Sequence, residues 1–453
     1  MKLYNIFTSS IWSAIGYVFS KGAILLVISL VSIILSIDDF AKFNLFLIVV
    51  NVFAGVIGLS MNVTANRYAK DTDNLSSILF LSITVSILGG FIYLMLEYLY
   101  FHMFLDNIER IISFFIIIFS IYSNSLSGFF YASGQFKKYA VIYSIQGIMM
   151  VILCYCMGRY FGLKGILLGL LLSYLFTTIF SIFYFKKRNI LFRFKRDLIL
   201  RSSSKVLIPG ILSGALFQPA ILITAFLIDK YANANEVIAY TIANQFRMTL
   251  GILPITLSSV LLKLLVDNKN YYLEKIERVN FSLSYYPIIL LSIVLLLFKD
   301  IIISLINNLD ANVFTICFVF FISGTVITSF KGAVSRKLVS EENGRISILS
   351  NLSWFGCFLL IAVVFIPTYG AAGAAFSFLI AQLLHLLAWS PFYIKNNYYC
   401  MEFFDYKFFL SIPVYIIMVI CVVFNYWVII FILLLLTIFL SIKEVLLLKR
   451  IEK

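Results

Sequence analysis

Residues 11–35 read IWSAIGYVFSKGAILLVISLVSIIL and contain one charged side chain, Lys21. A run of this length can cross the hydrocarbon core of a bilayer as a single helix, which takes about 20 apolar residues. A lysine near the centre of such a helix costs about 2.5–3.5 kcal/mol on insertion scales. The stretch therefore predicts a first membrane-spanning helix and raises the question of what the charge of Lys21 binds.

The composition of the whole chain agrees with this prediction. Of the 453 residues, 62% are hydrophobic and 12% are charged, whereas soluble domains carry about 25% charged residues. The mean hydropathy is +1.02. These values exclude an ordinary soluble domain and indicate an all-α polytopic membrane protein.

Apolar stretches of spanning length recur along the chain, and we predict fourteen helices. Only Asn425 and Tyr426 separate the last two, which could instead form one bent helix, and the total is twelve if this last pair does not span. The predicted spans are 11–35, 43–63, 75–96, 111–133, 139–158, 163–185, 206–228, 237–262, 281–298, 311–330, 346–366, 371–394, 408–424 and 427–442.

Lysine and arginine in short loops indicate the orientation of a membrane protein, because these residues are retained on the cytoplasmic side. If the N-terminus is cytoplasmic, 27 of the 35 lysines and arginines fall in inside segments and 6 in outside segments. The longest basic stretch, 186–205, is then a cytoplasmic linker beside anionic headgroups. We therefore expect both termini in the cytoplasm, attribute most of the net charge of +14 to topology and expect no nucleic-acid partner.

We expect no metal site, no cofactor and no catalytic residues. Five of the six cysteines lie in apolar runs, where cysteine usually acts as a small packing residue. The only two histidines, His102 and His385, are far apart in the sequence.

The two halves of the chain share an order of features at an offset of 208 residues. At this offset Gly162 falls on Gly370, each at an outer turn between two predicted helices, and Lys137 falls on Arg345. Six helices in each half would return the chain to the same side, so the repeats would have parallel topology, as in several transporter folds. We therefore predict two parallel-topology six-helix bundles around a central cavity, plus two C-terminal helices. The predicted domains are 1–190, the linker 191–205, 206–397 and 398–453.

Several stretches, in this order, resemble the multidrug/oligosaccharidyl-lipid/polysaccharide (MOP) transporter superfamily. They include IDDFAKFNLFLIVVNVFAGVIGLSMNVTANRYAKD (37–71), YASGQFKKYAVI (131–142), FGLKG (161–165) and AYTIANQFRMTLGILPITLSSVL (239–261). Within the superfamily the chain is most similar to its polysaccharide transporter branch, the Wzx-type O-antigen flippases.

This resemblance implies a function in lipopolysaccharide biosynthesis. A flippase of this branch would move undecaprenyl-diphosphate-linked oligosaccharide from the cytoplasmic to the periplasmic leaflet of the bacterial inner membrane by alternating access. Its partners would be this lipid-linked substrate, membrane lipids, and other O-antigen assembly proteins such as the polymerase and the chain-length regulator. Related lipid flippases line a cationic central cavity partly from their first and eighth helices, which carry Lys21 and Arg247 here.

Lys21 and Arg247 are the two deep charges of the predicted spans, and neither has an acidic partner nearby in the sequence. A buried cation is expensive unless a cavity hydrates it or an anion binds it. Ammonium and guanidinium groups suit phosphate oxygens. We therefore predict that both residues hold the substrate diphosphate; the alternative is that each snorkels or bonds backbone carbonyls between helices. Other basic candidates, with topology as the simpler explanation, are Arg67, Arg159 and Lys331.

Amides and helix-breaking residues complete the candidate set. The amides could line a sugar-binding cavity, although bonding helix to helix is their commoner use; they are Asn44, Asn51, Asn124, Gln218, Asn244 and Gln245. Prolines and glycines in the seventh and eighth spans allow bending; the candidate hinges are Pro209, Gly210, Pro219, Gly251 and Pro254.

Two other functions remain open from the sequence. An ion-coupled multidrug antiporter of the same superfamily would need an acidic group within the membrane to bind H⁺ or Na⁺, and none is evident in the predicted spans. A membrane polysaccharide polymerase or ligase would use the same lipid-linked sugars, but would be expected to carry catalytic groups on a long periplasmic loop.

The orientation can be tested by labelling single cysteines with a membrane-impermeant thiol reagent. We expect a cysteine placed in 97–110 to react from the periplasm, and one placed in 186–205 to react only after the membrane is opened, because the basic linker is retained inside. A cysteine-free variant provides the background. Labelling of 186–205 in intact spheroplasts would contradict the whole topology.

Overall fold

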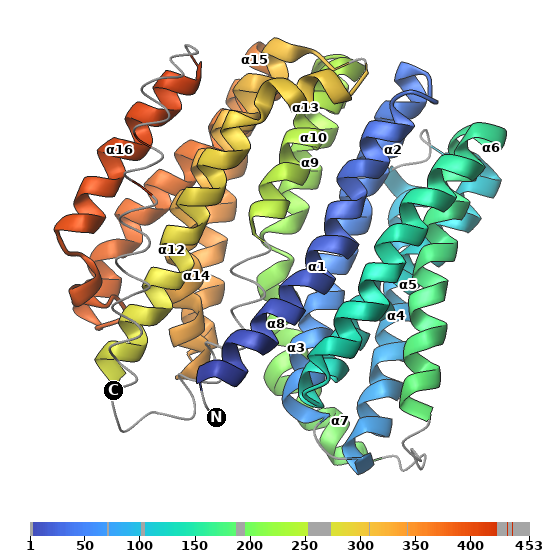
Figure 1. The fold of residues 1–453 in the computed structure, drawn as a ribbon, viewed down its shortest axis with the longest axis horizontal. Helices are drawn as coiled ribbons and strands as arrows, with labels where there is room; N and C mark the ends of the chain where they lie inside the picture. Colours follow the sequence, from blue (N-terminus) through green and yellow to red (C-terminus); the bar gives the residue numbers. More distant parts are fainter. Residues whose placement is uncertain are drawn as a thin grey trace. The chain divides into compact units, whose positions relative to one another are not determined.

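The computed structural model describes residues 3–69, 72–100, 105–186, 195–251, 273–307, 309–341 and 343–423, and the single positions 433 and 437 (Figure 1). The described chain forms two compact units. One comprises Met1–Ser10, Ile242–Leu305 and Leu309–Lys453, which we call the C-unit, and the other comprises Ile11–Thr241 and Ile306–Asn308, which we call the N-unit.

Throughout the described ranges the regular structure is helical. From the N-terminus to the end of the tenth helix the elements are α1 (Leu3–Val31), α2 (Ile37–Phe53), the π-helical segment η1 (Ala54–Gly58), α3 (Leu59–Tyr68), α4 (Thr72–Tyr100), α5 (Asn107–Ala132), α6 (Phe136–Lys186), α7 (Arg196–Ser202), the π-helical segment η2 (Ser203–Leu207), α8 (Ile208–Gly214), α9 (Gln218–Tyr231) and α10 (Ala234–Leu250). The later elements are α12 (Leu273–Leu297), α13 (Lys299–Leu305), α14 (Ala311–Ser340), α15 (Gly344–Lys395), the short 3₁₀ turn η3 (Met401–Phe403) and α16 (Tyr406–Val423).

The prediction of an all-helical polytopic membrane protein is confirmed. Within the described residues, nine helical stretches are long and apolar enough to cross a membrane, and Tyr406–Val422 is a shorter apolar helix. Two of the nine, in α6 and α15, are about 50 residues long, more than twice what one crossing needs. The last predicted span, 427–442, lies outside the described residues apart from positions 433 and 437.

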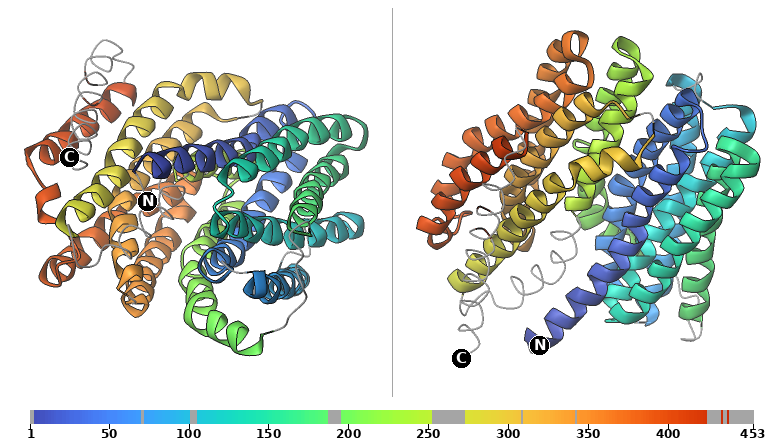
Figure 2. Two further views of the ribbon diagram at one scale, coloured as in Figure 1. Left: turned by 60° about the horizontal axis from the view of Figure 1, so that its bottom comes forward. Right: turned by 45° about the horizontal axis from the view of Figure 1, so that its top comes forward.

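The long helices α6 and α15 each fold back at a glycine. Gly162 has φ 58° and ψ −137° within α6, and Gly370 has φ 53° and ψ −132° within α15. Figure 2 shows the two limbs of α6 running side by side. The 208-residue offset that relates these glycines in the sequence therefore also relates their backbone conformations.

Small residues allow the two limbs of α6 to approach closely. A Cβ added at Gly165 would lie 2.0 Å from the carbonyl oxygen of Met157, and one at Gly169 would lie 2.7 Å from the backbone nitrogen of Cys154. In α15 a Cβ at Gly373 would lie 2.5 Å from the carbonyl oxygen of Phe365. Such contacts are typical of membrane helices, whose association depends on close packing.

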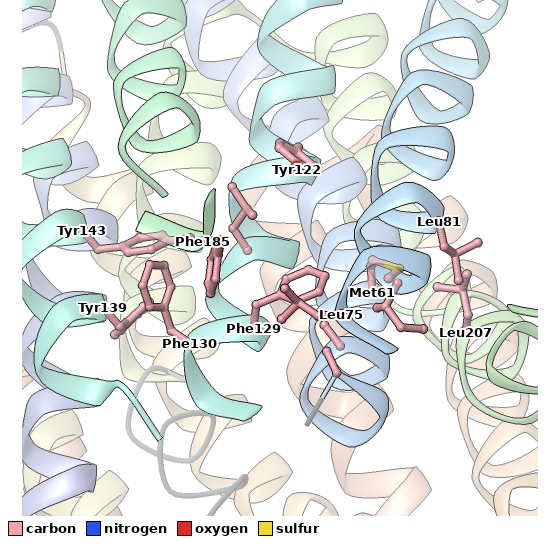
Figure 3. Packing of buried hydrophobic residues seen from close by; sticks show 14 residues of the cluster. Met61, Leu75, Leu81, Tyr122, Phe129, Phe130, Tyr139, Tyr143, Phe185 and Leu207 are labelled. Carbon is pink, nitrogen blue, oxygen red and sulfur yellow. The ribbon is translucent and has the colours of Figure 1, made fainter. Parts of the chain in front are cut away.

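An aromatic cluster forms the core at one end of the N-unit. It joins α3, α4, α5, α6 and η2 through buried side chains that include Phe129, Phe130 and Phe185 (Figure 3). The rings of Phe130 and Phe185 lie 4.9 Å apart between centroids, within the range in which aromatic pairs add stability beyond their buried area. This contact packs the end of α5 against the end of α6.

The turn that precedes α5 is held by a capping box. The Asp106 side chain accepts hydrogen bonds from the backbone of Ile108 and Glu109, and the Glu109 carboxylate accepts one from the backbone of Asp106. Lys164, just after the turn of α6, lies 2.7 Å from Asp106. The hydrogen bond from Lys164, helped by those from the backbone, lowers the pKa of Asp106 below its ordinary value.

Gly162 and Gly370, where α6 and α15 fold back, should not tolerate a side chain because of their backbone dihedral angles. Their dihedral angles lie in a region that residues with a Cβ adopt only at a cost of about 1–3 kcal/mol, so Gly162→Ala and Gly370→Ala should each lower the thermal stability of the purified protein in detergent. Gly356, within α15 with no atom near the position of a Cβ, is the matched control, and Gly356→Ala should be neutral or stabilising. Equal stability of all three variants would contradict this interpretation.

Candidate functional site

Arg247 is buried within the C-unit, at the end of α10, with 7% of its surface exposed. Its Nε donates a hydrogen bond to Oδ1 of Asn244 over 2.8 Å, so residues one helical turn apart hold the guanidinium in place. The centre of the guanidinium lies 5.2 Å from the ring of Phe378 and 5.8 Å from that of Phe321. These distances fit cation–π contacts, and they place the charge between α10, α14 and α15.

Lys21 lies in the part of α1 that belongs to the N-unit, and it is half-buried. No described residue is recorded as an ion-pair or hydrogen-bond partner of its ammonium group. Arg247 belongs to the C-unit. That the two cations converge on one ligand therefore stays a prediction.

The asparagines of α2 and α5 differ in whether their side chains make hydrogen bonds within their own helix. Asn44 donates through Nδ2 to the carbonyl of Phe40, and Asn124 does the same to the carbonyl of Ser120. Asn51 is also buried, and its Nδ2 finds no hydrogen-bond acceptor among the described groups. Helix-internal bonding thus accounts for Asn44 and Asn124 without a sugar, whereas Asn51 keeps a free donor.

The remaining amides lie near helix ends and turns. Gln218 is the first residue of α9 and lies against Gly55 of η1, where an added Cβ would be 3.3 Å from its side chain. Asn244 and Gln245 are buried next to Arg247. Among the predicted cavity-lining amides, Asn244 contacts Arg247, a predicted phosphate-binding cation.

The lower-ranked basic residues separate into surface and interior positions. Arg67 ends α3 beside the ring of Tyr68, with 5.9 Å between the guanidinium centre and the ring centroid, and Arg159 is exposed in α6 just before its turn. Lys331 instead lies inside α14, and its Nζ is buried. We return to its surroundings below.

The seventh predicted span, 206–228, is not one continuous helix. It comprises the end of η2, then α8, a turn at 215–217, and α9. Pro209 and Gly210 lie at the start of α8, which continues the helical backbone of η2 without a break. Pro219 is at the start of α9, after the turn, where proline's missing N–H leaves no helical bond unmade. Gly251 follows the end of α10, and Pro254 lies outside the described residues. Whether these positions act as hinges stays a prediction.

A buried ionic network between α12 and α14 was not predicted from the sequence. The predicted spans 281–298 and 311–330 leave its charged residues in loops, whereas α12 begins at Leu273 and α14 continues to Ser340. Within this extension Lys337 pairs with Glu277 at 2.6 Å. Arg336 donates to Oδ1 of Asn280 over 2.7 Å and to the hydroxyl of Ser284. A hydropathy window scores each charged residue separately. It therefore does not detect charges that are paired with one another in the folded protein.

Two buried carboxylates in the described chain, Glu277 and Glu97, have basic partners. Besides Glu277, Glu97 in α4 lies 2.8 Å from Arg110 in α5. Among the described residues, no group of three or more His, Cys, Asp or Glu side chains could hold a metal ion. The described interior therefore contains buried cations, which suit phosphate-like ligands. It contains no cluster of side chains that would bind a metal ion.

The Glu277–Lys337 pair should be important for stability. Removing one charge of a buried pair leaves the other uncompensated, so Glu277→Gln should destabilise the protein by about 3–5 kcal/mol, measured as a lower unfolding midpoint in detergent. The double change Glu277→Gln with Lys337→Met should recover much of this loss. The control is Lys42→Met, which removes the exposed Lys42–Asp39 pair and should cost less than about 1 kcal/mol. A Glu277→Gln effect no larger than the control would contradict the assignment.

Comparisons with known proteins identify the fold through structure alone. No protein-family model and no curated protein sequence matches the chain. Among solved structures, a MOP superfamily transporter from Pyrococcus furiosus aligns with a TM-score of 0.65 at 15% identity, over 86% of this chain and 95% of that one. It is described as having a binding pocket of reverse polarity that suggests a different function. A point mutant of the Vibrio cholerae MATE transporter VcmN aligns with a TM-score of 0.65 at 12% identity, over 87% and 98%.

Two further similar structures are described as conformations of a multidrug resistance MATE family transporter of the MOP superfamily. The outward-facing one has a TM-score of 0.63 at 16% identity, and the inward-facing one 0.62 at 15%; each alignment covers 86% of this chain and 96% of the other. At these identities the likeness establishes architecture. The chain is a multi-pass membrane protein with the fold of the MOP superfamily transporters.

Proposed function

We propose that this protein is a flippase that moves a lipid-linked oligosaccharide with a diphosphate headgroup across the membrane by alternating access. The observation that carries the proposal is the environment of Arg247, a guanidinium buried among apolar helices and held by Asn244 and two aromatic rings. A guanidinium positioned in this way can bind two phosphate oxygens at once.

The fold supports a transport cycle. The similar MATE structures include an outward-facing and an inward-facing conformation of a transporter, and we propose that this chain also alternates between two such states. In the P. furiosus structure, the stated reverse polarity of the pocket is linked to a different function. By analogy, a cationic lining in this chain favours an anionic substrate over the cationic compounds that a drug antiporter would export.

Lys21 provides the second cation in the proposal. It lies in the apolar helix α1, half-buried, with no ion pair to a described residue. A diphosphate carries enough negative charge for both an ammonium and a guanidinium group. The membrane potential, negative inside, would then favour outward movement of the anion by about 2.3 kcal/mol per charge per 100 mV. Substrate binding and the direction of transport would thus both depend on the phosphate charge.

The ion-coupled multidrug antiporter remains the second candidate, because the same fold neighbours are drug transporters. An antiporter of this kind needs an intramembrane carboxylate that can bind H⁺ or Na⁺. In the described chain, Glu97 and Glu277 are buried but each lies against a basic side chain, at 2.8 and 2.6 Å. A carboxylate neutralised by a neighbouring cation is a poor carrier, which favours the flippase.

The flippase proposal predicts that charge, and not size alone, is needed at both positions. Lys21→Ala and Arg247→Ala should strongly reduce surface O-antigen in a deletion strain of the parent bacterium and cause undecaprenyl-linked repeat units to accumulate in the cytoplasmic leaflet. Lys21→Arg and Arg247→Lys should keep part of the activity, with the smaller share for Arg247→Lys because lysine cannot bind bidentately.

Lys230→Ala, which removes an exposed charge at the end of α9, is the matched control and should leave O-antigen display unchanged. Protein amounts in the membrane must be equal for all variants. Normal O-antigen display by both alanine variants would refute the proposal, and drug efflux by cells that express the protein would favour the antiporter.

A further inference from the structure

A small cavity lined by both polar and apolar groups lies inside the C-unit, between α14, α15 and the turn that follows α15. Its polar lining consists of Lys331, Gln382, His385, Tyr393 and Tyr399, and two aliphatic side chains complete it. The interior has room for about one water-sized particle, ≈ 10 Å³. All of these side chains except Tyr399 lie in stretches apolar enough to span a membrane, so the cavity brings several polar groups together in a largely apolar part of the protein.

Two hydrogen-bond donors in this cavity have no acceptor among the described groups. The Nζ of Lys331 and the Nε2 of Gln382 are both buried, and neither makes a hydrogen bond to a described atom. Gln382 is only 2% exposed, so its amide cannot turn to solvent. Unmade donors of this kind are rare in folded proteins, because each costs about 1–3 kcal/mol, and more for a charged group.

The other polar side chains of the cavity already have partners. His385 lies 2.8 Å from the hydroxyl of Ser350 through Nε2, Tyr393 donates to the same hydroxyl over 2.8 Å, and Tyr399 lies 3.2 Å from the hydroxyl of Ser390. No aspartate or glutamate lines the cavity. The buried carboxylate of Glu277, in the same unit, pairs with Lys337. The cavity therefore combines one ammonium group with a free amide donor and lacks a protein anion.

We propose that this cavity binds a small inorganic anion of the size of chloride, held by the Lys331 ammonium and the Gln382 amide. A single-atom anion satisfies both free donors at once and compensates the buried charge. Phosphate and carboxylate groups are too large for a site that has the room of about one water molecule. The anion would join α14, which carries Lys331, to α15, which carries Gln382. This site is separate from the proposed substrate contacts at Arg247 and Lys21.

The first test is the halide dependence of thermal stability. The purified protein in detergent is unfolded in sodium chloride or sodium bromide, with sodium gluconate keeping the ionic strength constant. Binding to the folded state alone stabilises it by RT ln(1 + [L]/Kd), so the unfolding midpoint should rise and then level off with halide concentration. Lys331→Gln should abolish this rise and Gln382→Leu should weaken it.

The charge-matched control is Arg345→Gln, which removes one exposed cation from the same unit and should keep the halide response. If the unfolding midpoint of the wild-type protein does not depend on halide concentration, the proposal is wrong and water is the ligand that fits the cavity. A response of equal size in Lys331→Gln would also overturn it, because the anion would then bind elsewhere.

A second test does not depend on the stability of the variants. Trp354 is fully buried, and its ring centroid lies 5.8 Å from Nζ of Lys331. In a variant that retains only this tryptophan (Trp12→Phe, Trp389→Phe, Trp427→Phe), bromide bound in the cavity should quench its fluorescence in a saturable manner, and chloride should reverse the quenching. Quenching that is absent, or that grows linearly without saturation as for collisions from bulk solvent, would contradict the proposal.

Discussion

A charge inside the hydrocarbon region of a membrane must find a partner, because water is absent there and an isolated ion is expensive. This constraint organises much of the described interior. Glu97 lies against Arg110, Glu277 lies against Lys337, and Arg336 is held by Asn280 and Ser284. Each of these contacts joins two helices, so the groups that are most costly to bury are also the ones that hold neighbouring helices in register.

The polar groups of the backbone must also find hydrogen-bond partners inside a membrane. Helices satisfy their own polar groups, and only helices and closed barrels can do so in lipid. The chain reverses direction within α6 and α15 at Gly162 and Gly370, where a positive φ lets the turn form with little interruption of the helices. Glycines beyond each turn then allow the returning limb to touch the first one. Two long helices thus become two tight helical hairpins.

We assign ligands to two buried basic residues whose surroundings differ. Arg247 is positioned by Asn244 and aromatic rings, and Lys331 points its Nζ into a small cavity with a free amide beside it. Both are in the C-unit, yet their surroundings suit different anions. A guanidinium between aromatic rings suits a group with several oxygens, whereas an ammonium in a cavity of about one water's size suits a single atom.

The sequence by itself determined the class of this protein, the positions of most of its helices and the two turns at Gly162 and Gly370, because apolar length and glycine position are local properties of the chain. It also singled out Lys21 and Arg247, since each interrupts an apolar run. Only the tertiary structure decided which charges are partnered. Glu277 and Lys337, or Lys331 and Gln382, are distant in sequence, and their contacts arise from helix packing that no local pattern encodes. For the same reason the predicted span of α12 began too late and that of α14 ended too early, because charges that neutralise each other in three dimensions read as loop residues when each is counted alone.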